Sequence, residues 1–406
     1  MSRFIGIIGL IVILSIAYLI SNNKKKINWR LVAIGIGLQI LFALLILKFP
    51  LGRAAFEGVS SVITGLLEFT KEGSRFLFGD LVDSNKFGFI FAFQILPTII
   101  FFSAFMSVLY YLGIMQFIIS ILAKGIVKLL GTSGAETLSA VANIFLGQTE
   151  APLVVKPFVS TMTKSELLTI MTGGMATVAG SVMAGYVAMG VNAGHLLAAS
   201  IMAAPAGLIL SKMIFPETET PVTKGKTELK SEKINSNVID AAAHGAGEGL
   251  HLALNVGAML IAFIAIIAFL NAAIGWIGGL VGFPGLSLSW ILGRLFAPLV
   301  YVMGVPGSDA VAAGNLLGQK IVLNEFVAYT QLADFIKSGG LSPKAITIMT
   351  YALCGFANFS SIAMQIGGIG GLAPERRQEI AQLGIRALIG GALATCMTGT
   401  IAGLLL

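Results

Sequence analysis

The sequence predicts an all-α polytopic membrane protein with eight transmembrane helices, and two features of the composition support this fold class. Of the 406 residues, 56% are hydrophobic and only 11% are charged, whereas soluble domains carry about 25% charged residues. The 49 glycines suit closely packed and broken membrane helices. The net charge of +7 does not indicate a nucleic-acid partner, because the Lys and Arg residues lie in loops, where they orient a membrane protein.

Eight apolar segments are long enough to cross a bilayer, which takes about 20 helical residues. They cover residues 4–20, 31–49, 88–112, 166–190, 194–214, 253–280, 344–370 and 381–404. The first segment lacks a clear small-residue cleavage site, so we interpret it as a retained span. Lys24–Lys26 follow it and should be cytoplasmic, which places the N-terminus outside. Residues 54–80, 114–130 and 238–252 predict interfacial helices, and 286–304 a further short helix.

Two further segments are apolar but too polar for simple spans. Residues 134–162 contain Glu150 and are interrupted by prolines, and residues 306–338 contain Glu325. A carboxylate at membrane depth costs several kcal/mol unless it is paired or hydrated, so it indicates a functional site. Irregular backbone at that depth is tolerated only where it is buried in protein or lines a cavity. Both segments are therefore expected to form re-entrant hairpins.

One hydrophilic stretch, residues 215–237, predicts a cytoplasmic linker between two halves. The expected division is scaffold and interfacial helices in 1–133, the first repeat of a transport unit in 134–214, the linker in 215–237, the sixth, scaffold span in 238–285, and the second repeat in 286–406.

The two halves repeat weakly. Gly174–Gly180 in the fourth span aligns with Gly355–Ser361 in the seventh, and Met183 then aligns with Met364. Each half is a hairpin followed by an interrupted helix, and the hairpins enter from opposite sides by the span count. Inverted repeats with broken helices are typical of secondary transporters, although glycine- and alanine-rich helices can also align by chance.

Three motifs carry a family resemblance. Gly318–Tyr329, with the pattern Gly-x-Lys-x-x-x-Asn-Glu-Phe-Val-Ala-aromatic, resembles the signature of the concentrative nucleoside transporters, and Gly147–Leu153 and Gly355–Ser361 resemble that family too. The likeness covers nearly the whole chain. It implies a homotrimer in which a scaffold of spans one, two, three and six surrounds a transport unit that moves like an elevator. It also implies import of nucleosides driven by Na⁺ or H⁺.

The resemblance assigns substrate-binding residues, and their chemistry suits a neutral ligand with hydroxyls and a hydrogen-bonding base. Glu325, Asn358 and Ser361 would bind the ribose hydroxyls. The base would be recognised, directly or through water, by Gln148, Thr149 and Glu150, and the apolar walls would be Phe356 and Val182.

Each assignment has a structural alternative. Glu325 could pair with Lys320, although a five-residue separation is awkward on a helix. Glu150 could pair with Lys156 at the base of its hairpin. Asn358 and Ser361 could merely satisfy unwound backbone, and Phe356 and Val182 could be ordinary packing residues. For Lys320 the sequence predicts no role beyond neutralising local charge.

The coupling ion needs oxygen ligands at a hairpin tip beside a broken helix. Asn143 and Thr177 offer side-chain oxygens, and Leu146 and Val178 could offer backbone carbonyls. Members of the family with this asparagine look Na⁺-dependent, which favours Na⁺ here. The alternative for Asn143 is a hydrogen bond that stabilises the hairpin.

The function expected from the sequence is a Na⁺-coupled nucleoside symporter, multi-pass in a bacterial inner membrane, with no cofactor besides the coupling ion. Uridine is a representative substrate, and the choice between pyrimidine and purine nucleosides stays open. The alternatives are a proton-coupled symporter, a transporter of another small polar solute, a channel, or an intramembrane enzyme. The enzyme would need a nucleophile with a base, or a metal cluster, and the three histidines do not cluster.

Overall fold

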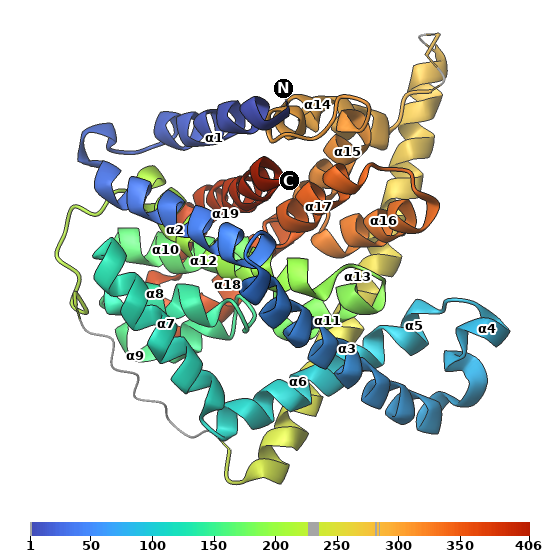
Figure 1. Ribbon diagram of the computed structural model, residues 1–406, viewed down its shortest axis with the longest axis horizontal. Coiled ribbons are helices and arrows are strands. Elements are labelled where there is room, and N and C mark those ends of the chain that lie inside the picture. The colour runs from blue at the N-terminus through green and yellow to red at the C-terminus, as the bar shows by residue number, and fades with distance from the viewer. Residues whose placement is uncertain (1, 226–234, 281, 284) are drawn as a thin grey trace.

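A computed structural model describes residues 2–225, 235–280, 282–283 and 285–406 of the chain (Figure 1). Within these ranges the chain forms helices and no β-strand. The helices of the N-terminal part are α1 (Ser2–Leu19), α2 (Trp29–Leu47), α3 (Pro50–Phe78), α4 (Ser84–Phe87), α5 (Phe91–Gln94), α6 (Leu96–Tyr111) and α7 (Ile114–Leu130). They are followed by α8 (Gly134–Ala142), α9 (Lys156–Val159), α10 (Lys164–Ala176), α11 (Gly180–Ala188) and α12 (Ala193–Ile214).

The C-terminal half contains the second set of helices. These are α13 (Val238–Leu280), α14 (Leu288–Val302), α15 (Ala310–Val322), α16 (Glu325–Ser338), α17 (Pro343–Leu353), α18 (Phe359–Leu372) and α19 (Arg377–Leu405). Short 3₁₀ turns complete the list at Lys24–Lys26, Gly79–Val82, Ala151–Val155 and Pro374–Arg376.

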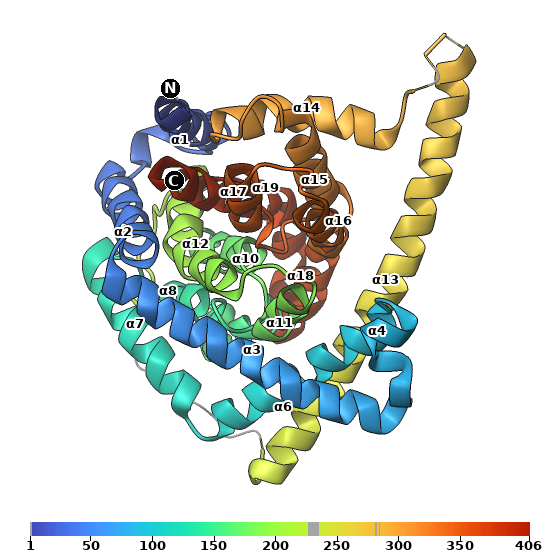
Figure 2. The same ribbon diagram turned by 45° about the vertical axis from the view of Figure 1, so that its right-hand side comes forward.

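The helices form an outer and an inner group. Figure 2 shows α1, α2, α3, α6, α7, α13 and α14 around a central group that includes α10, α12 and α15 to α19. The apolar window of Lys164–Ala188 in the inner group is 94% buried, whereas that of Val238–Leu280 in the outer group is 17% buried. Apolar side chains that stay exposed on outer helices are suited to contact lipid or a partner.

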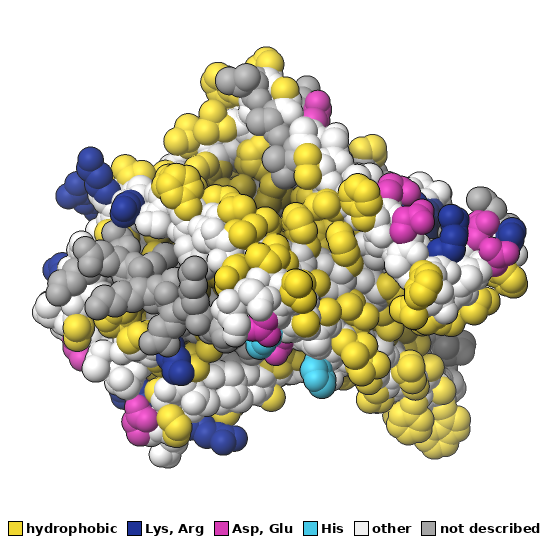
Figure 3. Space-filling view, turned by 90° about the horizontal axis from the view of Figure 1, so that it is seen from below, with side chains coloured by type: hydrophobic (Ala, Val, Ile, Leu, Met, Phe, Trp, Pro, Cys, Tyr) yellow, Lys and Arg dark blue, Asp and Glu magenta, His cyan; other side chains and the backbone are white. Residues whose placement is uncertain are grey.

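The surface seen from below carries many hydrophobic side chains, and most of the charged ones gather toward its left and right margins (Figure 3). Outer-helix residues such as Ile261 and Phe269 are 76% and 71% exposed. The distribution fits a protein whose solvent is a bilayer.

In the described part of the chain, six helical segments are long and apolar enough to span a membrane: Trp29–Leu47, Phe91–Tyr111, Lys164–Ala188, Ala193–Ile214, Val238–Leu280 and Pro374–Leu405. They correspond to predicted spans two to six and eight. The apolar part of α1, Ile5–Leu19, is shorter. Predicted span seven is divided into α17 and α18 by a break at Cys354–Asn358. The number of spans therefore stays a prediction.

Residues 238–252, which were predicted to be interfacial, do not form a helix of their own. These residues continue without interruption into the sixth apolar segment as α13, a single helix of 43 residues. Such a helix is about 65 Å long, about twice the hydrocarbon thickness of a bilayer. A seam of small residues supports it, because a Cβ at Gly245 would lie 2.7 Å from the Ser103 carbonyl oxygen of α6 and one at Gly249 would lie 2.7 Å from Ile100 Cα.

The two predicted hairpin segments each form two arms joined by a turn. In the first, α8 leads through residues 143–150 to the 3₁₀ turn Ala151–Val155 and α9. Pro152 and Pro157 lie in this second arm and prevent a regular α-helix. In the second, α15 and α16 are separated by Leu323 and Asn324 alone.

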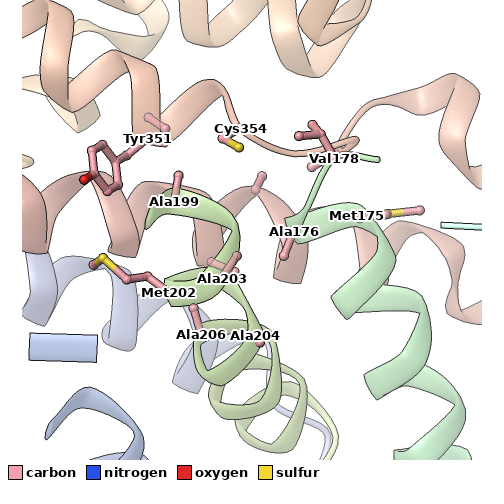
Figure 4. Packing of buried hydrophobic residues seen from close by; sticks show 14 of the residues in the cluster. Met175, Ala176, Val178, Ala199, Met202, Ala203, Ala204, Ala206, Tyr351 and Cys354 are labelled. Carbon is pink, nitrogen blue, oxygen red and sulfur yellow. The ribbon is translucent and has the colours of Figure 1, made fainter. Parts of the chain in front are cut away.

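The two interrupted helices lie against each other. The break between α10 and α11 covers residues 177–179, and the Phe356 amide of the other break donates to the Thr177 carbonyl at 3.1 Å. A Cβ on Gly355 would lie 2.8 Å from the Met175 carbonyl oxygen, so a glycine is needed for this approach. Figure 4 shows Ala176 at the end of α10 and Val178 of the first break near Cys354 of the second, with the buried alanines of α12 below.

The described part of the predicted linker, residues 215–237, is hydrogen-bonded to residues of the predicted first repeat. Residues 226–234 lie outside the described residues. Before them, Thr223 accepts hydrogen bonds from Gly134 N (3.0 Å, to its carbonyl) and from Ala135 N (3.1 Å, to its hydroxyl) at the start of α8. Glu217 accepts from the Thr163 hydroxyl at 2.8 Å. The two bonds to Thr223 satisfy helix-end amides that would otherwise lack partners.

A buried ion pair fixes the base of the first hairpin. Lys212 Nζ of α12 lies 2.7 Å from Glu136 of α8 and 3.2 Å from Glu217, and the side chains of Lys212 and Glu136 are 7% and 1% exposed. Lys212 also donates to the Ser165 hydroxyl at 2.9 Å. Removing one partner of a buried pair is costly, so this contact ties the hairpin to the inner helices.

Candidate functional site

Glu325 is the first residue of α16 and lies at the turn of the second hairpin. Its side chain is inside the protein, and the residue is 4% exposed. The preceding residue, Asn324, caps the helix by accepting from Val327 N at 2.9 Å. The free amides and the positive end of the helix dipole stabilise an anion at this position, which reduces the cost of burying the carboxylate.

Two side chains from other helices hold the Glu325 carboxylate. Asn358 Nδ2 donates to Oε2 at 3.0 Å, and the Tyr186 hydroxyl donates to Oε1 at 3.3 Å. Asn358 is the N-cap of α18, where its oxygen accepts from Ser361 N at 2.9 Å. The second interruption therefore presents the amide nitrogen of Asn358 to Glu325, while the amide oxygen completes the helix end.

The first hairpin joins this network through Gln148. Its Nε2 donates to the Ser361 hydroxyl at 2.9 Å, and its Oε1 accepts from Gln365 Nε2 at 3.2 Å. Gln365 also donates to the Met171 carbonyl at 2.8 Å. A Cβ on Gly174 would lie 2.8 Å from Gln148 Cβ, so a glycine in α10 allows this close approach. Gln148, Ser361, Asn358 and Glu325 thus form one chain of contacts.

Thr149 and Glu150 lie beside Gln148 at the tip and are exposed. The Glu150 carboxylate accepts from Gly147 N at 3.2 Å, which closes the local turn. Among the described residues no ion pair joins Glu150 to Lys156. A Cβ on Gly368 of α18 would lie 2.8 Å from Thr149 Cγ2, so Thr149 packs against α18, the helix that Asn358 caps.

The two predicted apolar wall residues are placed differently. Val182 on α11 is 1% exposed and belongs to the hydrophobic core. Phe356 is half-buried at the second interruption and packs against that core. Both are close in sequence to site residues, but neither makes a contact that separates a substrate wall from ordinary packing.

The residues predicted for the coupling ion lie on two adjoining loops. The first loop follows α8 and contains Asn143 and Leu146, and the second is the break after α10 with Thr177 and Val178. Gly180 N donates to the Phe145 carbonyl at 2.9 Å and joins the loops.

The oxygens on these loops suit a small hard cation. Asn143 is fully buried; its Nδ2 donates to the Ser139 carbonyl at 3.0 Å, but its Oδ1 has no hydrogen-bond partner. Within the described residues, the Leu146 and Val178 carbonyls accept no hydrogen bond. Thr177 donates its hydroxyl to the Gly173 carbonyl at 3.0 Å, which leaves the oxygen lone pairs free. A buried acceptor without a partner is costly, and a bound Na⁺ would satisfy it.

Lys320 has a different role from the one considered for it. No ion pair joins it to Glu325 among the described residues. Its Nζ donates to the Ala352 carbonyl at 2.9 Å and to the Thr395 hydroxyl at 2.6 Å. Ala352 lies in the last turn of α17, where the interruption leaves carbonyls without helical partners. Lys320 therefore supplies a hydrogen-bond donor to a free carbonyl at the end of α17 and links α15 to α17 and α19.

Replacing Lys320 with Met is expected to lower the thermal unfolding midpoint in detergent by several degrees. The variant keeps the length of the side chain but leaves the Ala352 carbonyl unpaired, which costs about 1–3 kcal/mol. Lys128→Met, at an exposed position on α7, is the matched control and should unfold within about a degree of the unchanged protein, because surface changes usually cost under ~0.5 kcal/mol. Equal midpoints for the two variants would remove this role from Lys320.

Sequence reasoning missed Tyr186 and Gln365 as parts of the site. Each lies on an apolar or glycine-rich helix, where a single aromatic or amide residue is common. Their contacts are to residues far along the chain: Tyr186 to Glu325, and Gln365 to Gln148. No local signal in the sequence indicates such pairs.

Family models match most of the chain. The model described as Na⁺ dependent nucleoside transporter C-terminus matches residues 195–403, the one described as Na⁺ dependent nucleoside transporter N-terminus matches 8–81, and a gate model described as nucleoside recognition matches 92–193. The chain belongs to the concentrative nucleoside transporter family.

Relatives and a solved structure agree with this membership. The chain is 50% identical over 409 residues to an uncharacterized transporter of Haemophilus influenzae, covering 100% of this chain and 98% of the relative. It is 44% identical over 411 residues to the nucleoside permease NupC of Helicobacter pylori, covering 99% and 98%. The structure of CNTnw in an inward-facing substrate-bound state matches with a TM-score of 0.94 and 47% identity, covering 100% of this chain and 98% of that one.

Concentrative nucleoside transporters are transporters and not enzymes, so the intramembrane enzyme is no longer an alternative. The Na⁺ dependence in the family description supports Na⁺ as the coupling ion. The positions of Glu325, Asn358, Ser361 and Gln148 also explain why the three motifs occur together in one chain. Each motif contributes one part of a single hydrogen-bonded network.

Proposed function

We propose that this protein imports nucleosides by coupling their movement to the entry of Na⁺. The observation that carries the proposal is the adjacency of two groups of polar atoms. One is the network of Glu325, Asn358, Ser361 and Gln148. The other is the set of uncharged oxygens around Asn143, whose Oδ1 is buried without a partner.

The proposed substrate is recognised from both hairpins. Glu325 accepts the ribose hydroxyls, and Asn358 and Ser361 assist it. On the side of the first hairpin, Gln148 exchanges its bond to Ser361 for bonds to the base, and Thr149 and Glu150 contribute directly or through water. The apolar sides of the base pack against Phe356 and Val182. A network built to bind hydroxyls discriminates strongly against analogues that lack them.

The proposed ion ligands are Asn143, Leu146, Thr177 and Val178. Asn143 and Leu146 belong to the turn that also carries Gln148, Thr149 and Glu150. An ion held between this turn and the break after α10 stabilises both in the arrangement that binds nucleoside. Ion and substrate would therefore raise each other's affinity, as thermodynamic linkage requires.

The alternative of proton coupling requires a titratable group in place of the ion. The four proposed ion ligands are an amide, a hydroxyl and two carbonyls, and none of them titrates near neutral pH. This donor set favours Na⁺. A transporter of another small polar solute is the remaining alternative, and the hydroxyl-accepting network around Glu325 favours a sugar-containing ligand over it.

The mechanical proposal follows the family resemblance. We expect a homotrimer in the bacterial inner membrane, with the N-terminus outside, eight spans and two re-entrant hairpins in inverted repeats. An outer scaffold would hold an inner transport unit that moves like an elevator. The division into a largely exposed outer group and a buried inner group of helices supports this proposal.

Uptake of labelled uridine into proteoliposomes tests the function. An inward Na⁺ gradient at equal pH should drive accumulation, and a K⁺ gradient or a proton gradient of the same size should not. One Na⁺ with one neutral nucleoside moves one charge, so an inside-negative potential of 100 mV adds about 2.3 kcal/mol, or about fiftyfold accumulation. Uptake that is independent of Na⁺ would contradict the proposal, and uptake driven by the proton gradient would favour the alternative. Competition by unlabelled pyrimidine nucleosides, purine nucleosides and free ribose defines the substrate class.

A further inference from the structure

We propose that Tyr186 is a positioning residue for nucleoside recognition, because its hydroxyl holds the Glu325 carboxylate in the orientation that accepts a ribose hydroxyl. The inference rests on the proposed function, in which Glu325 binds the ribose. It adds a residue that lies outside the three family motifs. Tyr186 is on α11, in the first repeat, whereas Glu325 is on α16, in the second.

The geometry distributes one donor to each carboxylate oxygen. The Tyr186 hydroxyl lies 3.3 Å from Oε1, and Asn358 Nδ2 lies 3.0 Å from Oε2. An ionised carboxylate has about four acceptor positions, so these two donors leave capacity for substrate hydroxyls. Without the Tyr186 hydroxyl, only Asn358 would hold the carboxylate, which could then rotate away from the ribose.

The Tyr186 ring cannot move freely. It is fully buried and stacks on Tyr329, with 4.1 Å between the ring centroids and 25° between the planes. It also makes an edge-to-face contact with the Phe326 ring, with 4.9 Å between the ring centroids and 65° between the planes. Both neighbours lie on α16, within four residues of Glu325. Because the ring packs on the helix that carries the carboxylate, its hydroxyl is a pre-organised donor, and a donor fixed in advance loses little entropy on binding.

A simpler interpretation is that Tyr186 only satisfies its own buried hydroxyl. Buried tyrosines usually find a hydrogen-bond partner, and a carboxylate serves that purpose. The two interpretations differ in one observable. If the Tyr186 hydroxyl only satisfies itself, its removal changes stability and the affinity for all substrates alike. If it positions Glu325, its removal changes the affinity only for substrates that present the ribose hydroxyl accepted by Glu325.

Tyr329 provides a matched control. It is fully buried, it belongs to the same stack, and its hydroxyl donates to the Thr350 carbonyl at 2.7 Å. Tyr329→Phe therefore removes a buried hydroxyl from the same aromatic cluster without removing a donor to Glu325.

The experiment compares uridine with 2′-deoxyuridine and 3′-deoxyuridine as competitors of labelled uridine uptake at fixed Na⁺. Tyr186→Phe should lower the apparent affinity for uridine by about tenfold, as expected for loss of a hydrogen bond to a charged group. The apparent affinity for the deoxyuridine that lacks the hydroxyl bound by Glu325 should change by less than about twofold, so the preference for uridine over it shrinks by about five- to tenfold. Tyr329→Phe should leave that preference unchanged.

An equal loss for uridine and both deoxyuridines, or no loss for any of them, would overturn the role of Tyr186. Thermal unfolding checks that Tyr186→Phe is folded. If the Tyr186→Phe protein cannot be produced in folded form, Tyr186→Met, which keeps a flexible apolar side chain, is measured in the same way. Glu325→Gln distinguishes failure of the ribose assignment from failure of the role of Tyr186. If that variant also loses no preference for the hydroxyl, the ribose assignment fails. If Glu325→Gln loses the preference and Tyr186→Phe does not, only the role of Tyr186 fails.

Discussion

Glu325→Gln should lower uridine uptake at sub-saturating concentrations by at least about 100-fold, the cost of losing charged hydrogen bonds worth about 1.5–3 kcal/mol each. The change is nearly isosteric, but a glutamine offers one acceptor oxygen and an NH₂ group that can only donate. Asn358 Nδ2 and the Tyr186 hydroxyl approach opposite oxygens of the carboxylate. The new NH₂ group therefore either faces the Asn358 NH₂ group, donor against donor, or forces the Tyr186 hydroxyl to turn.

Initial rates of labelled uridine uptake in proteoliposomes measure this effect. The purified variant should elute like the unchanged protein and keep its thermal unfolding midpoint to within a few degrees, which excludes loss of folding as the cause. Glu375→Gln, at an exposed position before α19, is the matched control and should transport normally. Normal uptake by Glu325→Gln would exclude Glu325 from the substrate site.

Asn143→Ala is expected to raise the Na⁺ concentration for half-maximal uptake by about tenfold or more, since each oxygen contact to a charged species is worth about 1.5–3 kcal/mol. The variant loses Oδ1, which is buried and has no protein partner. It also loses the bond from Nδ2 to the Ser139 carbonyl. The apparent affinity for uridine should fall at low Na⁺ and return toward normal at saturating Na⁺, because the ion and the nucleoside are linked.

Uptake measured over a range of Na⁺ concentrations at constant ionic strength tests this expectation. Asn192→Ala, which removes the exposed N-cap of α12, controls for the loss of an asparagine that only stabilises a helix. An unchanged Na⁺ dependence in Asn143→Ala would place the ion elsewhere. A lower maximal rate with the same Na⁺ dependence would support the structural alternative, in which Asn143 only stabilises the hairpin.

Most of the helical architecture could be predicted from local properties. The segments 31–49, 194–214 and 381–404 are apolar over the length of a bilayer, and each corresponds to one long helix, α2, α12 or α19. Hydrophobic length alone did not predict where the helix of the sixth span begins. Residues 238–252 carry Asp240, His244, Glu248 and His251 and look interfacial, yet nothing in them ends a helix. Close packing of their glycines on α6 continues the helix through them.

The candidate site was partly predictable for a related reason. The motifs place unusual residues at fixed spacing, so Glu325, Asn358, Ser361, Gln148 and Asn143 could be selected from the sequence and its family resemblance. The structure brings the first four into one network. It also finds a role for Lys320, which forms no ion pair with Glu325 among the described residues but donates to the Ala352 carbonyl at the end of α17.

The helical membrane fold class and the two interruptions could be inferred from the sequence alone, because hydrophobic length, glycine content and a charge at membrane depth are local properties. The main polar residues were selected through the family resemblance of the three motifs. The partners of those residues could not be inferred from the sequence. Tyr186 and Glu325 are separated by 139 positions, and Gln148 and Gln365 by 217. Whether such residues meet depends on how helices pack, and a hydrogen bond changes greatly in strength over a few tenths of an ångström. The tertiary structure therefore decides which side chain orients the glutamate.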